Sequence, residues 1–202
     1  MIEQELRKLY SDRLPLLEAT KDQIVEVLQL VLNDVPRIDQ ITGRVKDLDK
    51  FTEKAFRSEE NGSLKYHYPL EEIQDQIGCR VVVYFLSDVD PVADRVLKEF
   101  HPFEHRIVEE QKPDQFSYRA RHFVCQIPIA IRDQLQPPIN VFELQISTLF
   151  QHAWAEANHD LGYKSPGDLS WETRRFLAFT AAQAWGADTI FEDIRQSLKK
   201  NS

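Results

Sequence analysis

The chain has 202 residues and a formal net charge of −8, with 42% hydrophobic and 29% charged residues. A chain of this size buries a core without disulfides or metals, so we expect one substantial domain over residues 1–202. The acidic balance disfavours broad contact with a nucleic-acid backbone unless the basic residues gather in one place. No apolar run reaches the length of about 18 residues that a membrane-spanning helix needs, so we expect no membrane partner.

The two cysteines, Cys79 and Cys125, both lie in apolar runs. This context is typical of small buried hydrophobic residues, and no Cys-x-x-Cys spacing suggests a bridge or a metal pair. The charged N-terminal segment also lacks the apolar stretch of a secretory signal. We therefore expect a cytoplasmic protein.

The first third of the chain has two helical patterns. Apolar residues at helical spacing over residues 2–33 predict a helix, with Pro15 as the point where it would break and Pro36 beyond its end. A second helical pattern follows residues 42–46 and continues to about residue 57. Within it, lysines at positions spaced by four are expected to share one face.

The rest of the chain mixes strands and helices. Residues 70–77 predict a short helix, and the almost continuously apolar residues 79–85 (CRVVVYF) predict a central strand that is covered on both faces. A helix is expected over residues 88–100, with Asp88 as its N-cap. The remaining patterns predict strands over residues 104–110, 117–127 and 140–147 and helices over residues 148–163 and 171–198. This order predicts the α/β (α+β) class, with a mixed sheet of about five strands flanked by helices.

One candidate site is the basic cluster of Arg44, Lys46, Lys50 and Lys54. Cations that share a helix face repel one another, and a polyphosphate would relieve that repulsion. A phosphate also benefits from the positive end of a helix dipole. The alternative is a solvated face that the acidic residues between these lysines neutralise.

Two carboxylates form a second candidate site. Asp75 precedes the apolar strand, and Glu143 shares one face of the strand NVFELQIST with Gln145. A carboxylate in a strand that can be buried is costly unless it has a partner or a task. Together the two residues offer oxygen ligands for Mg²⁺ on a phosphate substrate. The alternatives are an Asp75–Arg80 ion pair and a Glu143 that faces solvent or pairs with an arginine.

A third candidate is the pair Tyr118 and His122, which lie on the same side of the predicted strand 117–127. A tyrosine ring can stack on a base, and a histidine can bind phosphate. The alternative is a surface strand with mixed packing. The chain has no P-loop motif, and its single His-Asp dipeptide, at residues 159–160, lacks the further histidine arrangement of a phosphohydrolase.

In this order, the motifs resemble the synthetase domain of the RelA/SpoT alarmone enzymes. The matching segments are residues 43–46 with Lys54, residues 75–80, Tyr118 with His122, residues 143–148 and residues 154–164. The resemblance covers residues 40–165 as a catalytic core of nucleotidyltransferase-like fold, between an N-terminal helix (1–35) and a C-terminal helix (168–202). It implies a GTP/GDP pyrophosphokinase that transfers pyrophosphate from ATP to the 3′-hydroxyl of GDP or GTP, giving (p)ppGpp and AMP.

The resemblance also implies a role for each matching residue. The implied roles are ATP binding by Arg44, Lys46, Lys54 and Arg80, Mg²⁺ binding by Asp75 and Glu143, and acceptor binding by Tyr118, His122 and Gln145. Glu143 would also activate the attacking hydroxyl, which makes it and Asp75 the catalytic pair. These residue types suit phosphoryl-type transfer, which depends on positioning and on neutralising charge.

The chain departs from the family pattern mainly on the acceptor side. The segment KPDQFSY before and including Tyr118 is two residues longer than the usual motif and lacks its Asn-Gly, and Ser147 stands where the family has an arginine. Lys50 stands where relatives often have serine. These differences leave open a toxic small synthetase that acts on an adenine nucleotide or the 3′ end of tRNA, and a degenerate nucleotide-binding module. The acidic isoelectric point of about 5.3 argues against a broad tRNA contact.

The chain has no room for the hydrolase and regulatory domains of the long family members, so the resemblance implies a small stand-alone synthetase. In such relatives the flanking helices mediate oligomers. Residues 2–33 and 171–198 carry apolar stripes that suit a homo-oligomer, although packing within a single domain explains them equally well.

Overall fold

The structure is a computed structural model that describes residues 2–108, 120–132, 139–164 and 169–200. In chain order its elements are α1 (Glu3–Val31), β1 (Ile38–Val45), α2 (Leu48–Ala55), α3 (Pro69–Glu72), the 3-10 turn η1 (Gln74–Gln76), β2 (Ile77–Val83), α4 (Leu86–Glu99), β3 (Pro102–Val108), β4 (Ala120–Gln126), α5 (Ile129–Arg132), β5 (Val141–Thr148), α6 (Leu149–Lys164) and α7 (Trp171–Lys200). Within these ranges, no helix combines the length and the apolar character needed to cross a membrane.

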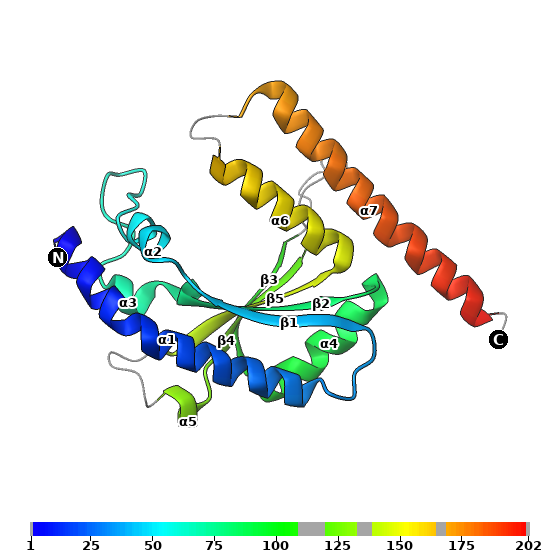
Figure 1. Cartoon of the computed structure of the whole chain (residues 1–202), viewed down its shortest axis with the longest axis horizontal. Helices are drawn as coiled ribbons and strands as arrows, with labels where there is room; N and C mark the ends of the chain where they lie inside the picture. The colour runs from blue at the N-terminus through cyan, green and yellow to red at the C-terminus, as the bar shows by residue number, and fades with distance from the viewer. Residues whose placement is uncertain (1, 109–119, 133–138, 165–168, 201–202) are drawn as a thin grey trace.

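The five strands form one sheet in the order β1-β2-β5-β4-β3. Strands β2 and β5 are parallel, whereas the other neighbouring pairs are antiparallel. Helices α1, α4 and α5 lie on one side of the sheet and α6 lies on the other, with α7 outside α6 (Figure 1). Helix α2 packs against the N-terminal part of α1, where Tyr10 stacks on Phe51. The predicted mixed sheet with flanking helices is therefore confirmed.

Helix α1 packs its apolar stripe on the sheet. Leu6, Tyr10, Leu17, Ile24 and Leu28 are all buried at helical spacing. The predicted break at Pro15 is wrong, because the helix continues through this residue. Pro15 has no N–H to donate to the carbonyl of Ser11, and both residues are exposed. Water can therefore satisfy that carbonyl, while burial on either side of Pro15 holds the helix together.

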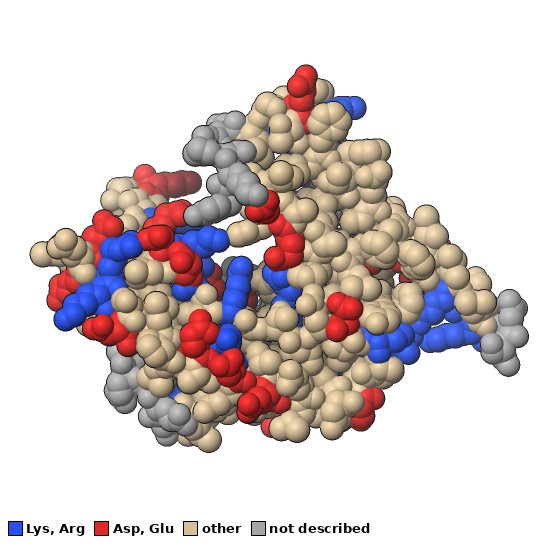
Figure 2. Space-filling view, viewed as in Figure 1, with Lys and Arg blue, Asp and Glu red and all other residues tan. Residues whose placement is uncertain are grey.

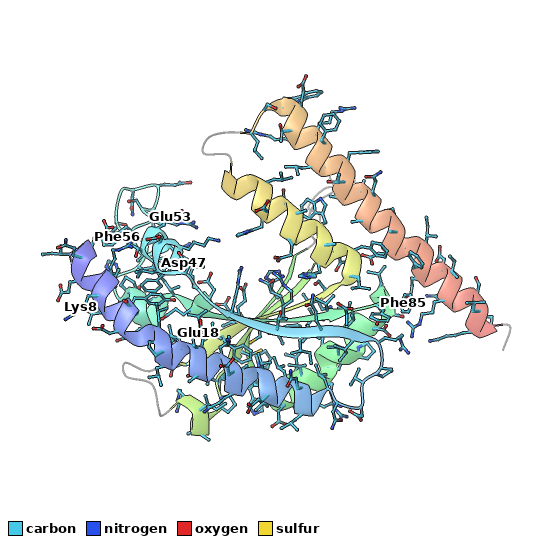
Figure 3. The ribbon with its side chains drawn as sticks, in the orientation of Figure 1. Lys8, Glu18, Asp47, Glu53, Phe56 and Phe85 are labelled. Atoms are coloured by element: carbon cyan, nitrogen blue, oxygen red, sulfur yellow. The ribbon has the colours of Figure 1, made fainter. Side chains whose placement is uncertain are left out.

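The first strand was missing from the sequence-based prediction. Residues 38–45 (IDQITGRV) alternate poorly, yet they pair antiparallel with β2 along the edge of the sheet. Helix α2 begins only at Leu48, where Asp47 accepts hydrogen bonds from the backbone N–H groups of Asp49 and Lys50 as N-cap. Figure 3 labels the N-cap Asp47, the C-cap Phe56 and, between them, Glu53. Lys46 thus follows a strand, and the predicted helix face shared by three lysines is wrong.

Strands β2 and β5 create one apolar and one polar face. Their register places Gly78 beside Glu143 and Arg80 beside Gln145. The residues between them, Cys79, Val81, Leu144 and Ile146, belong to the buried core on the opposite face. The alternation predicted for β5 therefore places polar residues on one face of the sheet and core residues on the other.

Helix α4 starts at Leu86 after the N-cap Phe85, so the prediction of Asp88 as N-cap is wrong. Asp88 is buried in the first turn and accepts hydrogen bonds from Arg37, at 2.7 and 3.0 Å, while Arg195 lies 3.3 Å away. A buried carboxylate needs such partners, and here they come from the loop before β1 and from α7.

Helix α7 has few buried residues, namely Ala181, Asp188 and Glu192, and many of its apolar residues are exposed. The buried Asp188 accepts a hydrogen bond from the hydroxyl of Thr148, at the end of β5, at 2.7 Å. The exposed apolar residues are Trp171, Phe176, Phe179, Trp185, Ile190, Phe191, Ile194 and Leu198. The oligomer inferred from the apolar stripes of the terminal helices stays a prediction.

Gly43 marks a close approach between β1 and α1. A Cβ at this position would lie 2.7 Å from Cγ of Lys21 and 2.8 Å from Cγ2 of Val25. We expect Gly43→Ala to lower the free energy of unfolding by about 1–3 kcal/mol, measured by urea denaturation, because the helix must shift.

The matched control is Gly186→Ala in α7, where an added Cβ meets nothing within 4 Å. Since alanine is the better helix former, this variant is expected to gain about 0.5–1 kcal/mol. If Gly43→Ala were as stable as Gly186→Ala, the close approach would not constrain residue 43.

Candidate active site

The centre of the site is the carboxylate of Asp75. Lys46 Nζ lies 2.7 Å from Asp75 Oδ2, and Lys54 Nζ lies 3.0 Å from Oδ1. Lys46 follows β1, Lys54 lies in the last turn of α2, and Asp75 lies in η1. Three segments therefore place two ammonium groups and one carboxylate in contact.

The backbone around Asp75 is fixed by buried hydrogen bonds. The N–H of Lys46 donates to the carbonyl of Gln76 at 2.8 Å. The buried Gln76 side chain in turn donates to the carbonyls of Leu70 and Ile73 at 3.0 and 2.8 Å. These contacts join the end of β1 to the turn before β2, which explains why the ion pairs form here.

Opposing effects set the pKa of Asp75. Burial raises it, but the hydrogen bonds and charges of Lys46 and Lys54 outweigh burial and hold the pKa below its ordinary value of 3.8. The carboxylate is therefore ionised at neutral pH and keeps the two lysines close together.

A chain of polar contacts runs across the polar face of the sheet. His122 Nδ1 lies 3.1 Å from Glu143 Oε1, and Gln145 donates to Glu143 Oε2 at 3.2 Å. Arg80 donates to Gln145 at 3.4 Å and also to Glu156 of α6. This chain links strands β4, β5 and β2 to α6.

Glu143 is also ionised. Burial raises its pKa, His122 lowers it, the nearby charge of Asp75 raises it, and Gln145 lowers it, with the net result below the ordinary value. Asp75 and Glu143 line the same cavity, which is why the charge of one acts on the other.

Two adjacent hollows lie along this polar chain. The first, with a cavity volume of about 510 Å³, is lined by residues that include Lys54, Arg57, Lys65, Tyr66, Asp75, His122 and Glu143. The second, of about 310 Å³, is lined by residues that include Thr42, Arg44, Gly78, Arg80, Gln145, His152 and Glu156. Figure 2 shows the surface hollowed between α2 and α6, with basic side chains on its walls. Cavities of this size are typical of small-molecule sites.

The structure brings most of the predicted site residues together. Asp75, Glu143, His122 and Lys54 line the first hollow, and Arg44, Arg80 and Gln145 line the second. Tyr118 lies outside the described residues, so its predicted role stays a prediction.

The structure also tests the alternatives drawn from the sequence. Asp75 does not pair with Arg80, whose acidic partner is Glu156. Among the described residues, which do not include Arg119, the ion-pair partner of Glu143 is His122 and not an arginine. Lys50, the remaining member of the basic cluster, lies 3.3 Å from Nε2 of His159.

Several residues of the hollows were not predicted. His152 and Glu156 are four apart on α6 and both contact Arg80. Their spacing of four residues within a predicted helix was the sequence feature that could have placed them on one face. The polar segment after α2 contributes Arg57, Lys65 and Tyr66 to the first hollow. Nothing in the spacing of these residues in the sequence indicated a pocket.

The donor set suits a hard divalent cation bound together with phosphate. Across the described part of the chain, no cluster of three or more His, Cys, Asp or Glu residues is arranged to hold a metal by itself. Two carboxylates that line one cavity leave the remaining positions to phosphate oxygens and water, which is the usual mode for Mg²⁺. The residues therefore fit a metal that arrives with its nucleotide.

Comparison with known proteins identifies the family. Residues 43–168 match the model of the region found in RelA/SpoT proteins. The chain belongs to the RelA/SpoT family. The resemblance drawn from the motifs is thus confirmed, and the matched segment contains nearly every residue of both hollows.

Similar proteins cover most of this RelA/SpoT chain. It is 28% identical over 171 residues to GTP pyrophosphokinase YjbM of Bacillus subtilis (strain 168). This match covers 83% of this chain and 77% of that protein. The crystal structure of small alarmone synthetase 1 from Bacillus subtilis has a TM-score of 0.75 at 26% identity, covering 96% of this chain and 98% of the other. The same synthetase bound to its product pppGpp has a TM-score of 0.72 at 25% identity, covering 95% and 99%.

The lowered pKa of Asp75 predicts an acid-sensitive contribution to stability. At pH 7 and without nucleotide, we expect Asp75→Asn to lower the free energy of unfolding by about 1–2 kcal/mol, because both lysines lose a charged partner. The contribution is present above the unfolded pKa and is lost as the pH falls through the lower folded pKa. Urea denaturation from pH 7 to pH 3 should therefore show the two proteins converging below about pH 4. A difference that stayed constant with pH would contradict this assignment.

Proposed function

We propose that the chain is an ATP-dependent pyrophosphokinase that transfers pyrophosphate from ATP to the 3′-hydroxyl of GDP or GTP, making (p)ppGpp and AMP. The observation that carries this proposal is that Asp75 and Glu143 line one cavity beside Lys54, with Lys46 bound to the same Asp75. The relatives named GTP pyrophosphokinase and the neighbour bound to pppGpp support the same reaction for this chain.

The donor nucleotide fits the second hollow. Arg44 and Arg80 both line it, and guanidinium groups stack well on aromatic bases. With adenine there, the triphosphate of ATP extends toward Lys46 and Lys54 at the first hollow. These lysines then hold phosphate oxygens in competition with Asp75.

Mg²⁺ is the proposed cofactor, held by Asp75 and Glu143. When bound, it withdraws charge from the phosphate oxygens and so favours attack on phosphorus. Lys46 and Lys54 contribute in the same direction as cations, and their contacts with Asp75 already place them beside the proposed metal ligand.

The acceptor is proposed to bind over β4 and β5. Glu143 takes the proton of the 3′-hydroxyl while the oxygen of that hydroxyl bonds to the β-phosphorus. The bond from this phosphorus to the α–β bridging oxygen breaks, and AMP leaves with the electron pair. His122 and Gln145 hold the Glu143 carboxylate in position, and Tyr118 is the proposed stacking partner of guanine.

The reaction itself gives the first test of this proposal. Purified protein with ATP and Mg²⁺ is expected to form AMP and (p)ppGpp from GDP or GTP, measured by anion-exchange chromatography, and chelation of the metal should abolish the product. Parallel reactions with ADP and with tRNA test the other acceptors. Labelled product on tRNA or ADP with none on guanine nucleotides would overturn the proposed acceptor.

The role of Glu143 gives a second prediction. We expect Glu143→Gln to lower kcat by about 100- to 1,000-fold, because an amide cannot take the proton of the hydroxyl or bind the metal as well. The matched control is Glu99→Gln, which changes an exposed carboxylate on α4 and should keep full activity. If Glu143→Gln turned over as fast as the parent protein, the catalytic assignment would be wrong.

A further inference from the structure

Lys65 is a cation of the first hollow to which the proposed reaction assigns no role. It follows a short hairpin after α2, in which Ser58 and Leu64 form a bridge and Gly62 adopts a left-handed φ of 83°. The N–H of Lys65 donates to the carbonyl of Arg57 at 2.9 Å. The hairpin thus folds back so that Lys65 stands beside the end of α2, on the wall of the hollow.

An aromatic ring orients the Lys65 side chain. Its Nζ lies 5.8 Å from the centre of the Tyr66 ring, which is within range of a cation–π interaction. Tyr66 is half-buried and packs against the hydrophobic core. The ring is therefore a fixed platform, whereas most exposed lysines sample many rotamers.

Four acidic residues line the hollow, and each has contacts with other groups. Glu104 accepts a hydrogen bond from Gln74 at 3.4 Å. Asp75 binds two lysines, and Glu143 contacts His122 and Gln145. Glu72 accepts hydrogen bonds from the backbone N–H groups of residues 67 and 68 at 2.7 and 3.1 Å.

Lys65 contrasts with these groups, because within the described ranges it forms no ion pair. The neighbouring Arg57 pairs with Glu53 at 3.2 Å, but both side chains are mostly exposed, so this pair is weak. Two cations at this wall of the hollow are thus available to an anion.

We propose that Lys65, with Arg57 beside it, binds a nucleotide phosphate that lies beyond the reach of Lys46 and Lys54. The inference rests on the proposed function, since it takes nucleotides as the ligands. One source is the γ-phosphate of ATP, whose triphosphate would run from the second hollow past Lys54 into the first. The other source is the 5′-phosphates of an acceptor whose 3′-hydroxyl is at Glu143.

The two sources predict different substrate preferences for the enzyme. A contact with the γ-phosphate favours ATP over ADP as donor, and so favours transfer of pyrophosphate over transfer of a single phosphate. A contact with the 5′-phosphates favours GDP over GMP as acceptor. The chemistry of recognition is the same in both cases, a charge-assisted hydrogen bond to a phosphate oxygen.

Equilibrium binding tests the proposal without requiring turnover. Dissociation constants of α,β-methylene-ATP, ADP, AMP, GDP and GMP are measured by calorimetry with Mg²⁺ for the parent protein, Lys65→Ala and the control Lys98→Ala, an exposed lysine of α4. We expect Lys65→Ala to raise the Kd about five- to tenfold for the nucleotide whose phosphate it binds, and to leave AMP and GMP unchanged. Lys65→Arg should recover most of the loss, and Lys98→Ala should match the parent protein.

The pattern of the loss identifies the source. Weaker binding of the ATP analogue with unchanged ADP assigns Lys65 to the γ-phosphate, and weaker binding of GDP with unchanged GMP assigns it to the acceptor. Unchanged Kd values for every nucleotide, or an equal loss for AMP and GMP, would overturn the proposal. A parent protein that binds these nucleotides but forms no (p)ppGpp would overturn the proposed reaction instead, and the binding series would still decide the role of Lys65.

Discussion

The contact of Asp75 with Lys46 and Lys54 is the interaction on which the site depends. The desolvation cost of burying these charged groups is smaller when they are in contact, because the carboxylate stabilises both ammonium groups and they stabilise it. The same arrangement keeps two cations side by side, where like charges would otherwise separate. The fold therefore fixes the positions of Lys46 and Lys54, the proposed phosphate-binding lysines, in the absence of nucleotide.

The parallel pairing of β2 with β5 arranges the rest of the site around this centre. It places Gly78 beside Glu143 and Arg80 beside Gln145, so that side chains far apart in sequence become neighbours on one face. Because Gln145 contacts both Glu143 and Arg80, the two hollows share a wall of hydrogen-bonded groups. A donor in one hollow and an acceptor in the other would thus meet at a fixed boundary, which reduces the entropy cost of bringing two substrates together.

Local patterns in the sequence predicted the parts of the fold that local physics controls. The apolar run of β2 and the alternation in β5 were both recognisable in the sequence. Strand β1 was not, because an edge strand with a polar face has little apolar pattern to detect.

Contacts between distant residues were equally hidden. Lysines spaced by four suggested one helix face, whereas Lys46 reaches Asp75 from the end of a strand. The partners of Arg80 and the position of Lys65 depend on long-range packing and on a folded hairpin, neither of which leaves a periodic signal.

The buried Asp88 has a consequence for how the chain reaches its final state. Its carboxylate contacts Arg37, a left-handed residue with a φ of 63°, and Arg195. One guanidinium comes from the residue before β1, and the other comes from α7. During synthesis the ribosome releases residue 195 long after the strands that form the sheet, so a nascent chain can assemble most of its core while this carboxylate still lacks its second partner. We therefore expect α7 to dock after the sheet has assembled, when Arg195 becomes available to Asp88.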